Sequence, residues 1–312
     1  MSLEINKISF VIPCYGSEKT ISFVIQDIVE TVEDKNDYEI ICVNDCSKDN
    51  VFKVLKKLAT RNDKVKVINL AKNSGQHNAL MCGFRHVSGD IIVCLDDDGQ
   101  TDPKDCYKLI DALDENVDLV FARYPNKHHS KFRNFGSYIN KKMSEWLCDV
   151  PNDIVITSYY ACKRFVVDEL IRYNNPYTFL AGLFFRTTKN VKNIDIIHKD
   201  RISGKSGYTI FSLIGLWMNG FTAFSVKPLR IASFLGLLIA FFGFAFGIYQ
   251  IIMKILNPTR PIGYSSIMCT ILFVGGMIML MLGLIGEYIG RIYICINNSP
   301  QYVIKEKINF ND

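Results

Sequence analysis

Three consecutive carboxylates, Asp96, Asp97 and Asp98, follow the apolar residues 91–95. An unbroken apolar run of this kind is typical of a buried strand in a parallel sheet. The carboxyl end of such a strand lies at the sheet edge where α/β proteins bind ligands. Asp96 and Asp98 are two positions apart, so in extended backbone they point the same way and can share one hard cation. The spacing predicts a divalent-metal site that holds a diphosphate, and the alternative is a solvated acidic turn.

Alternating strands and helices are predicted to position these carboxylates. We expect strands at residues 7–13, 38–44, 65–70, 91–95 and 118–122, and helices at residues 18–31, 49–61, 76–87 and 103–115. This alternation predicts an α/β fold in which a mostly parallel sheet carries helices on both faces. Polar loops follow the strands, where ligand groups are expected. The sequence contains neither a GxGxxG nor a P-loop pattern, which argues against a dinucleotide-binding fold and a P-loop nucleotidase.

Two uncharged segments, residues 231–253 and 266–286, are each about long enough to cross a bilayer. A short loop with Pro258 and Pro261 separates them, so we predict a transmembrane hairpin over residues 231–290. Their glycines would let the two helices approach closely, and such hairpins can form homo-oligomers. The apolar segment before the hairpin, within residues 209–230, is expected to be an interfacial helix, and a third crossing is the alternative. Residues 291–312 are expected to form a cytoplasmic tail.

Composition and charge favour a domain in the cytoplasm that lies against a membrane. The mean hydropathy is +0.12, although 21% of the residues are charged, and the net charge of +5 suits an anionic leaflet. Lysines and arginines flank the hairpin more than they occupy its loop, and residues 1–6 lack an apolar signal core. The ten cysteines are scattered without a CxxC pair, as expected in a reducing compartment. No basic stripe interleaved with aromatic residues is present, which argues against nucleic-acid binding.

Several motifs together resemble a known enzyme family. The segments VIPCYGSEKTI, VNDCSKDN, NSGQHNALMCGF and GDIIVCLDDDGQTDP resemble glycosyltransferase family 2, which has the GT-A fold. The later segments RISGKSGY, VKPLRIASFLG and GEYIGRIY are similar to those of polyprenyl-phosphate glycosyltransferases. That group includes dolichyl-phosphate mannose synthase and bacterial enzymes that transfer a sugar to undecaprenyl phosphate. The resemblance implies a GT-A catalytic domain over residues 1–208.

The resemblance also implies where a nucleotide-sugar donor, UDP-linked, would bind. Asp45 matches the carboxylate that accepts a hydrogen bond from the base, although without the neighbouring motifs it would be more typical of a turn or helix-cap carboxylate. Asn44 stands where an aspartate is more usual. Asp96 and Asp98 match the metal-binding DxD motif, for Mg²⁺ or Mn²⁺. The other residues that we assign to the donor site are Pro13, Tyr15, Glu18 and Gln76.

A lipid phosphate acceptor changes what catalysis requires. The second pKa of a phosphate monoester is about 6, so at neutral pH the acceptor is already a nucleophilic dianion that needs cationic positioning more than a base. Arg201, with its bidentate guanidinium, is the first candidate, and Ser206 lies in a glycine-flanked loop beside it. Arg123, Lys131 and Arg133 either contact the substrate phosphates or form a solvated basic face that docks on anionic lipid.

Asp153 lies near a position where family members often carry an aspartate proposed as the base, and it is either that base or a loop cap. The sequence therefore predicts an inverting, metal-dependent glycosyltransferase that is multi-pass in the cytoplasmic (inner) membrane. It would transfer one sugar to undecaprenyl phosphate for cell-envelope glycan synthesis. The alternatives are a transferase that acts on a glycan hydroxyl and a catalytically silent nucleotide-sugar-binding module. The absence of the processive synthases' QxxRW motif argues against a polysaccharide synthase.

Overall fold

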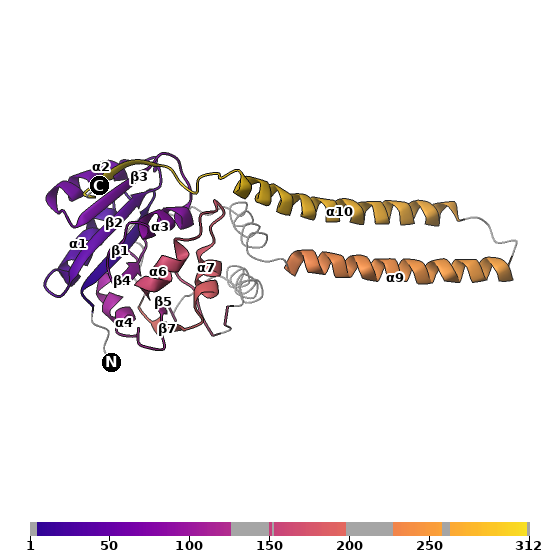
Figure 1. Cartoon of the computed structure of the whole chain (residues 1–312), viewed down its shortest axis with the longest axis horizontal. Helices are drawn as coiled ribbons and strands as arrows, with labels where there is room; N and C mark the ends of the chain where they lie inside the picture. The colour runs from indigo at the N-terminus through magenta and orange to yellow at the C-terminus, as the bar shows by residue number, and fades with distance from the viewer. Residues whose placement is uncertain (1–4, 126–149, 152, 198–226, 258–262, 311–312) are drawn as a thin grey trace. The chain divides into compact units, whose positions relative to one another are not determined.

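The computed structural model describes residues 5–125, 150–151, 153–197, 227–257 and 263–310. They belong to two compact units, one formed by residues 1–213 with 298–312 and the other by residues 214–297. The first unit contains the sheet, and the second contains two long helices (Figure 1). The chain therefore leaves the sheet-containing unit and later returns to it.

A mixed, mostly parallel sheet forms the centre of the first unit. Its strands are β1 (Lys7–Cys14), β2 (Asp37–Asn44), β3 (Val65–Leu70), β4 (Ile91–Cys94), β5 (Leu119–Arg123), β6 (Tyr160–Lys163), β7 (Val191–Asp195) and β8 (Ile304–Ile308). The strand order is β7-β5-β6-β4-β1-β2-β3-β8. β1 pairs in parallel with β2 and β4, β2 with β3, and β5 with β7, whereas β6 and β8 are antiparallel to their neighbours. The predicted α/β fold class is confirmed.

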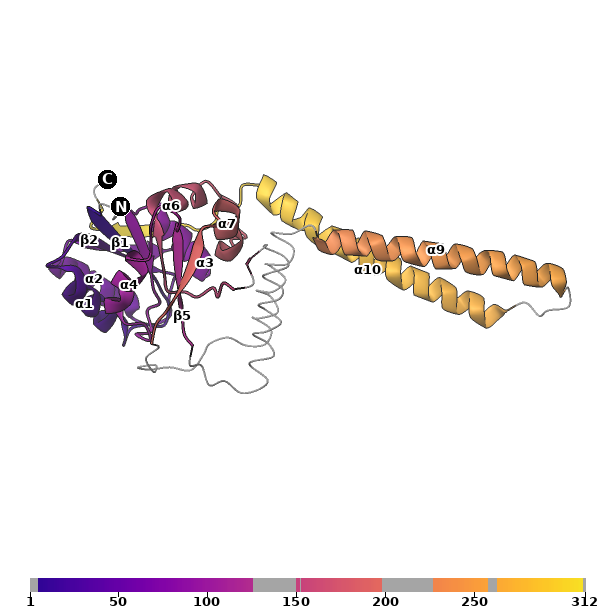
Figure 2. The ribbon, with the colours of Figure 1, turned by 90° about the horizontal axis from the view of Figure 1, so that it is seen from below.

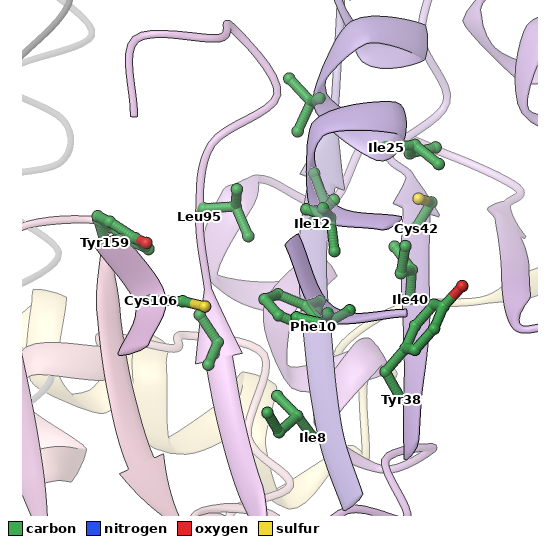
Figure 3. Packing of buried hydrophobic residues seen from close by; sticks show 14 of the residues in the cluster. Ile8, Phe10, Ile12, Ile25, Tyr38, Ile40, Cys42, Leu95, Cys106 and Tyr159 are labelled. Atoms are coloured by element: carbon green, nitrogen blue, oxygen red, sulfur yellow. The ribbon is translucent and has the colours of Figure 1, made fainter. Parts of the chain in front are cut away.

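The central strands are buried on both faces because helices cover both sides of the sheet. Even-numbered residues of β1, such as Ile8 and Phe10, pack with Tyr38 and Ile40 of β2 in one apolar cluster (Figure 3). Val11 points to the opposite face, where a Cβ at Gly83 would come within 2.5 Å of its Cγ1. The apolar runs of the sequence thus supply two layers of core rather than one.

Short helices cover the sheet (Figure 2). They are α1 (Ile21–Val32), α2 (Val51–Arg61), α3 (Gln76–Phe84), α4 (Cys106–Ile110), α6 (Arg164–Leu170) and α7 (Leu180–Thr187). The helix predicted at residues 103–115 is shorter: a 3-10 turn at Pro103–Asp105 leads into α4, which ends at Ile110. Beyond it Asp114 accepts a hydrogen bond from the backbone N–H of Asn116 at 2.7 Å, which favours a turn over further helix.

Two long apolar helices, α9 (Lys227–Leu256) and α10 (Tyr264–Ile296), form the second unit. Segments Leu229–Met253 and Phe273–Ile296 are long and apolar enough to cross a membrane. Almost none of their side chains is buried within the protein, unlike the side chains of a core helix. The second segment begins later than the predicted residues 266–286 and includes an ion pair between Glu287 and Arg291. The predicted interfacial helix at residues 209–230 lies largely outside the described residues.

After α10 the chain returns to the sheet. β8 pairs antiparallel with β3, and Ile308 lies opposite Val67 in the register. The side-chain amide of Asn309 then donates to the carbonyls of Ala59 at 2.7 Å and Val65 at 2.9 Å. The sequence analysis did not predict this strand within the tail at residues 291–312. Its residues alternate between half-buried and exposed, as in an edge strand.

Candidate active site

Four loops meet at the carboxyl edge of the parallel strands. β1, β2, β3 and β4 run in the same direction, so the residues that follow each of them lie at one edge of the sheet. β6 runs the opposite way beside β4, with Tyr160 opposite Cys94, so the residues that precede β6 reach that edge as well. This topology brings together chain segments that are far apart in the sequence.

Asp96, directly after β4, is held by two side chains. The amide of Gln76, at the start of α3, donates to Oδ1 of Asp96 at 3.0 Å. The hydroxyl of Ser158, just before β6, donates a short hydrogen bond to Oδ2. Both carboxylate oxygens are therefore oriented by neighbouring elements. Gln76 was assigned to the donor site from the sequence, and the structure places it beside Asp96.

Ser158 is a residue of this site that the sequence analysis missed. It lies in the same run as Asp153, but nothing in its type distinguishes it from a loop serine. The missing information was the antiparallel pairing of β4 with β6, which brings Ser158 next to the acidic loop. Asp153 itself lies in an exposed turn.

Asp97, the middle carboxylate, connects the acidic loop to the loop after β1. Its Oδ2 accepts a hydrogen bond from the backbone N–H of Tyr15 at 2.9 Å, and its carbonyl accepts one from Thr20 Oγ1 at 2.6 Å. Burial, together with the charges of Asp96 and Asp98, raises the pKa of Asp97 to about 6, although the hydrogen bonds that its carboxylate accepts oppose this shift. A cation beside these three carboxylates would relieve their mutual repulsion.

Asp98 lies in a tight turn that follows Asp97. Its Oδ1 accepts a hydrogen bond from the backbone N–H of Gln100 at 3.1 Å. The intervening Gly99 has φ +73°, a conformation that a residue with a Cβ adopts only with strain. The turn therefore depends on glycine directly after the acidic triplet.

Asp45 organises the loop between β3 and α3. Its two carboxylate oxygens accept hydrogen bonds from the backbone N–H groups of Ser74 at 2.6 Å and Gly75 at 2.8 Å. The side chain is buried, and this burial raises its pKa although both hydrogen bonds oppose the shift. Asn44 donates to Asn69 Oδ1 at 2.8 Å and accepts from the N–H of Ser47, so in this chain it has a structural function. Contact of Asp45 with a base stays a prediction.

The loop after β1 contains the other predicted donor contacts. Pro13 is buried in β1, and the side chain of Tyr15 is 51% exposed. Glu18 accepts a hydrogen bond from the backbone N–H of Asn50 at 3.1 Å, directly before α2. Its own N–H donates to Asp49 at 2.9 Å, so Glu18 connects the first two loops of the site. Their contacts with a nucleotide stay predictions.

The basic candidates are only partly described by the structure. Arg123, at the end of β5, forms a bidentate ion pair with Asp195 at the end of β7. This pairing favours a structural function for Arg123 over phosphate binding. Lys131, Arg133, Arg201 and Ser206 lie outside the described residues.

The acidic loop fits a hard divalent cation. Carboxylate oxygens are the ligands that Mg²⁺ and Mn²⁺ prefer, and Mg²⁺ sites often use only one or two carboxylates together with water and substrate phosphate oxygens. Among the described residues there is no group of three or more His, Cys, Asp or Glu side chains suited to a metal ion. A cation at Asp96 and Asp98 would therefore depend on a bound diphosphate for further ligands. Gln76 and Ser158 would orient Asp96 for it.

This architecture defines a GT-A-type α/β protein. The fold is similar to that of glucosyl-3-phosphoglycerate synthase from Mycobacterium tuberculosis, solved in complex with Mn²⁺, uridine diphosphate and phosphoglyceric acid. The TM-score is 0.52 at 18% sequence identity, and the match covers 68% of this chain and 74% of that chain. At this identity the likeness establishes the fold alone.

The chain belongs to glycosyltransferase family 2. The model of that family matches residues 9–171, and the model of the GtrB C-terminal hairpin matches residues 227–292. The chain is 30% identical to the SfII prophage-derived bactoprenol glucosyl transferase of Shigella flexneri, over 96% of this chain and 98% of the relative. It is also 30% identical to the undecaprenyl-phosphate 4-deoxy-4-formamido-L-arabinose transferase of Proteus mirabilis, over 98% of this chain and 95% of the relative. The predicted family and its enzyme class are confirmed.

Proposed function

We propose that this family 2 glycosyltransferase moves one sugar from a UDP-sugar to a polyprenyl phosphate, undecaprenyl phosphate, at the cytoplasmic face of the membrane. The observation that carries this proposal is the extent of the match to the bactoprenol and undecaprenyl-phosphate transferases. It includes the hairpin as well as the catalytic domain, so both the donor site and the membrane anchor have counterparts in those enzymes. The product would supply cell-envelope glycan synthesis or modification.

The donor would bind at the carboxyl edge of the sheet. Asp96 and Asp98 would hold Mg²⁺ or Mn²⁺, and the ion would neutralise the charge that develops on the diphosphate leaving group. Gln76 and Ser158 hold the Asp96 carboxylate in one orientation. Asp97 holds the loop that carries Tyr15 against the acidic loop, which fixes the position of the predicted nucleotide contacts relative to the carboxylates.

The acceptor would be held by residues of the segments that follow β5 and β7. At neutral pH its phosphate is a dianion and attacks the anomeric carbon without first losing a proton to the enzyme. Arg201 and Ser206 would bind and orient this phosphate, with Arg133 as a secondary contact. A single in-line displacement without an enzyme nucleophile inverts the anomeric configuration. Asp153, in its exposed turn, would then be dispensable as a base.

The return of β8 to the sheet supports a topology with two crossings. β3 and β8 belong to one sheet, so the chain segments before and after the hairpin must lie on the same side of a membrane. An even number of crossings satisfies this requirement, and α9 and α10 supply two. A third crossing by residues 209–226 would place β8 on the wrong side. We therefore propose that residues 209–226 lie at the interface, and the lysines and arginines that flank the hairpin support a cytoplasmic catalytic domain.

Two other functions remain as alternatives to this proposal. A transferase that acts on a glycan hydroxyl would need a general base, whereas a silent module would bind a nucleotide sugar without turnover. The intact acidic loop, with Asp96 oriented on both oxygens, favours an active enzyme over a silent module. Assembly of a homo-oligomer through the hairpin is a further proposal.

Labelled donors distinguish these functions. Membranes that contain the protein are incubated with a panel of radiolabelled UDP-sugars, undecaprenyl phosphate and Mn²⁺, and the organic phase is analysed by mass spectrometry. We expect one UDP-sugar to give a lipid-linked monosaccharide that disappears with EDTA. Label in a water-soluble glycan would favour the hydroxyl acceptor. Donor binding without any product would favour the silent module and contradict the proposal.

A further inference from the structure

Arg85, at the end of α3, connects three segments that are far apart in the sequence. Its Nη1 donates to Oε1 of Gln301 at 2.8 Å and to the hydroxyl of Tyr302 at 3.1 Å. Its Nη2 donates to the carbonyl of Tyr173 at 3.0 Å and to Oδ1 of Asn174 at 2.6 Å. The guanidinium therefore joins α3 to the loop before α7 and to the segment that follows the hairpin.

Gln301 completes this connection from the other side. It is 7% exposed, and its amide donates to the carbonyl of Asn175 at 3.0 Å and to Oγ1 of Thr178 at 2.5 Å. Each polar atom of its side chain thus has a partner within the protein. A buried and fully hydrogen-bonded amide of this kind fixes the segments that it joins, because removal of the side chain leaves its partners unsatisfied.

The loop fixed by Arg85 and Gln301 also holds the first turn of α3. The imidazole Nδ1 of His77 donates to the carbonyl of Thr178 at 3.2 Å, and burial lowers the pKa of this histidine, which favours the neutral ring. The amide of Asn78 donates to the carbonyl of Pro176 at 3.1 Å. The residue before His77 is Gln76, whose amide orients Asp96.

We propose that Gln301 and Arg85 are positioning residues for sugar transfer. They hold the loop at residues 174–178, this loop holds the first turn of α3, and that turn places Gln76 on Asp96. The segment after the hairpin is then a functional part of the catalytic domain, and the geometry of the acidic loop depends on it. This inference rests on the proposed role of Asp96 in donor binding.

Removal of the Gln301 amide tests the connection. In full-length Gln301→Ala, we expect the amides of Asn78 and Ala79, which donate to the Gly75 carbonyl, to exchange hydrogen at least about 10-fold faster than in the wild type. We expect the Mn²⁺ concentration for half-maximal binding in the presence of UDP, followed by the EPR signal of free Mn²⁺, to rise about 10-fold. The kcat should fall about 10-fold, with a smaller change in the KM of the donor.

Three further variants separate positioning from a general loss of stability. Gln301→Glu keeps the acceptor for Arg85 but loses both donors, so it should exchange like Gln301→Ala. Thr178→Val removes the partner hydroxyl at similar volume, and its effect should not add to that of Gln301→Ala. Asn309→Ala lowers stability from the same segment through contacts with α2 and β3, and it should leave Mn²⁺ binding and exchange in α3 unchanged.

The outcomes are decisive for the positioning proposal. Unchanged exchange in α3 and unchanged Mn²⁺ binding in Gln301→Ala would overturn it, as would equal changes in Asn309→Ala. Exchange is measured without donor or acceptor, so it tests the connection even if the proposed substrates are wrong. A wild-type protein that bound no Mn²⁺ in the presence of UDP would contradict the metal site of the proposed function and leave the exchange measurement to decide on positioning.

Discussion

The three neighbouring aspartates have different environments although they are identical in type. Asp96 is oriented by side chains from α3 and from the segment before β6, and Asp97 by the backbone of the loop after β1. Asp98 accepts a hydrogen bond from the backbone of its own turn. The acidic triplet thus joins three loops, and its charge is concentrated where four parallel strands end.

The charge of Asp98 is expected to be essential. Asp98→Asn should reduce lipid-linked product to background, because a neutral amide is a poor ligand for a hard cation that must also hold a diphosphate. Asp153→Asn should retain measurable turnover, since a phosphate dianion needs no base. Initial rates with undecaprenyl phosphate and saturating Mn²⁺ measure both. Equal loss in the two variants would show that Asp153 acts as a base.

Ser158 is expected to act through Asp96. Ser158→Ala removes one of the two side chains that orient Asp96. It should raise the Mn²⁺ concentration for half-maximal activity by about 10- to 100-fold, as the loss of a hydrogen bond to a metal ligand does at other metal sites. Ser158→Thr keeps the hydroxyl and serves as the matched control. A Mn²⁺ titration of product formation compares them. The same midpoint in the alanine variant and the wild type would refute the role assigned to Ser158.

Site residues that lie within a family motif could be predicted from the sequence. Site residues that are brought in by the pairing of distant strands could not. Asp96, Asp98 and Gln76 all lie in segments that resemble the family, and the structure brings Asp96 and Gln76 together. Ser158 and Gln301 are ordinary polar residues in the sequence, and their contacts depend on strands β6 and β8. Arg123 was a candidate for phosphate binding because it is a basic residue at the end of the fifth predicted strand. The sequence did not reveal its ion pair with Asp195, which is 72 residues away in the chain.

At the scale of elements, the first four strands and three helices follow the periodicity of the sequence closely. β3 has the predicted bounds of residues 65–70, because an apolar strand flanked by polar turns leaves little freedom. β6, β7 and β8 were not predicted. β6 is only four residues long. β8 (IKEKI) contains three charged residues, so its sequence resembles a solvated tail, and only the pairing with β3 identifies it as a strand.

The packing of α3 on β1 depends on Gly83. A methyl group at this position would lie 2.5 Å from Cγ1 of Val11, a β-branched side chain on a buried strand that has little room to move. Overpacking in Gly83→Ala should therefore lower the free energy of unfolding by about 1–3 kcal/mol. The higher helix propensity of alanine should offset roughly 1 kcal/mol of this loss. Thermal unfolding measures the loss. Val11→Ala in the same chain should restore part of it, and additive losses would contradict this close contact.

At the scale of the whole molecule, stability in acid depends on Glu39 at the opposite edge of the sheet. Its carboxylate accepts hydrogen bonds from Ser9 at 2.6 Å and Lys66 at 2.8 Å, which connects β1, β2 and β3. Burial alone would raise its pKa, but these hydrogen bonds and those from Ser88 lower it from 4.5 to about 2. Because the folded pKa is depressed, the stabilisation is complete above the unfolded pKa and is lost as the pH falls from 4.5 to about 2.

This dependence predicts the acid unfolding of the full-length protein in a non-ionic detergent. The shift corresponds to about 3 kcal/mol at neutral pH. Glu39→Gln should be less stable at pH 7 and should lose less stability between pH 4.5 and 2 than the wild type, because its amide does not titrate. Urea unfolding midpoints across this range compare the two proteins. Parallel curves would mean that other carboxylates determine acid stability.

The two ends of the hairpin are expected to lie on one side of the membrane. β8 follows the hairpin and pairs with β3, which precedes it, so the sheet cannot form unless both segments are in the same compartment. An epitope after Asp312 should therefore be inaccessible to antibody in intact spheroplasts and accessible after lysis. An epitope between Thr259 and Arg260 should be accessible in both. Access to the carboxyl-terminal epitope in intact spheroplasts would require an odd number of crossings, or a catalytic domain outside the cytoplasm. An odd number of crossings would separate β8 from β3, with which it pairs. A catalytic domain outside the cytoplasm would separate the proposed site from its nucleotide-sugar donor.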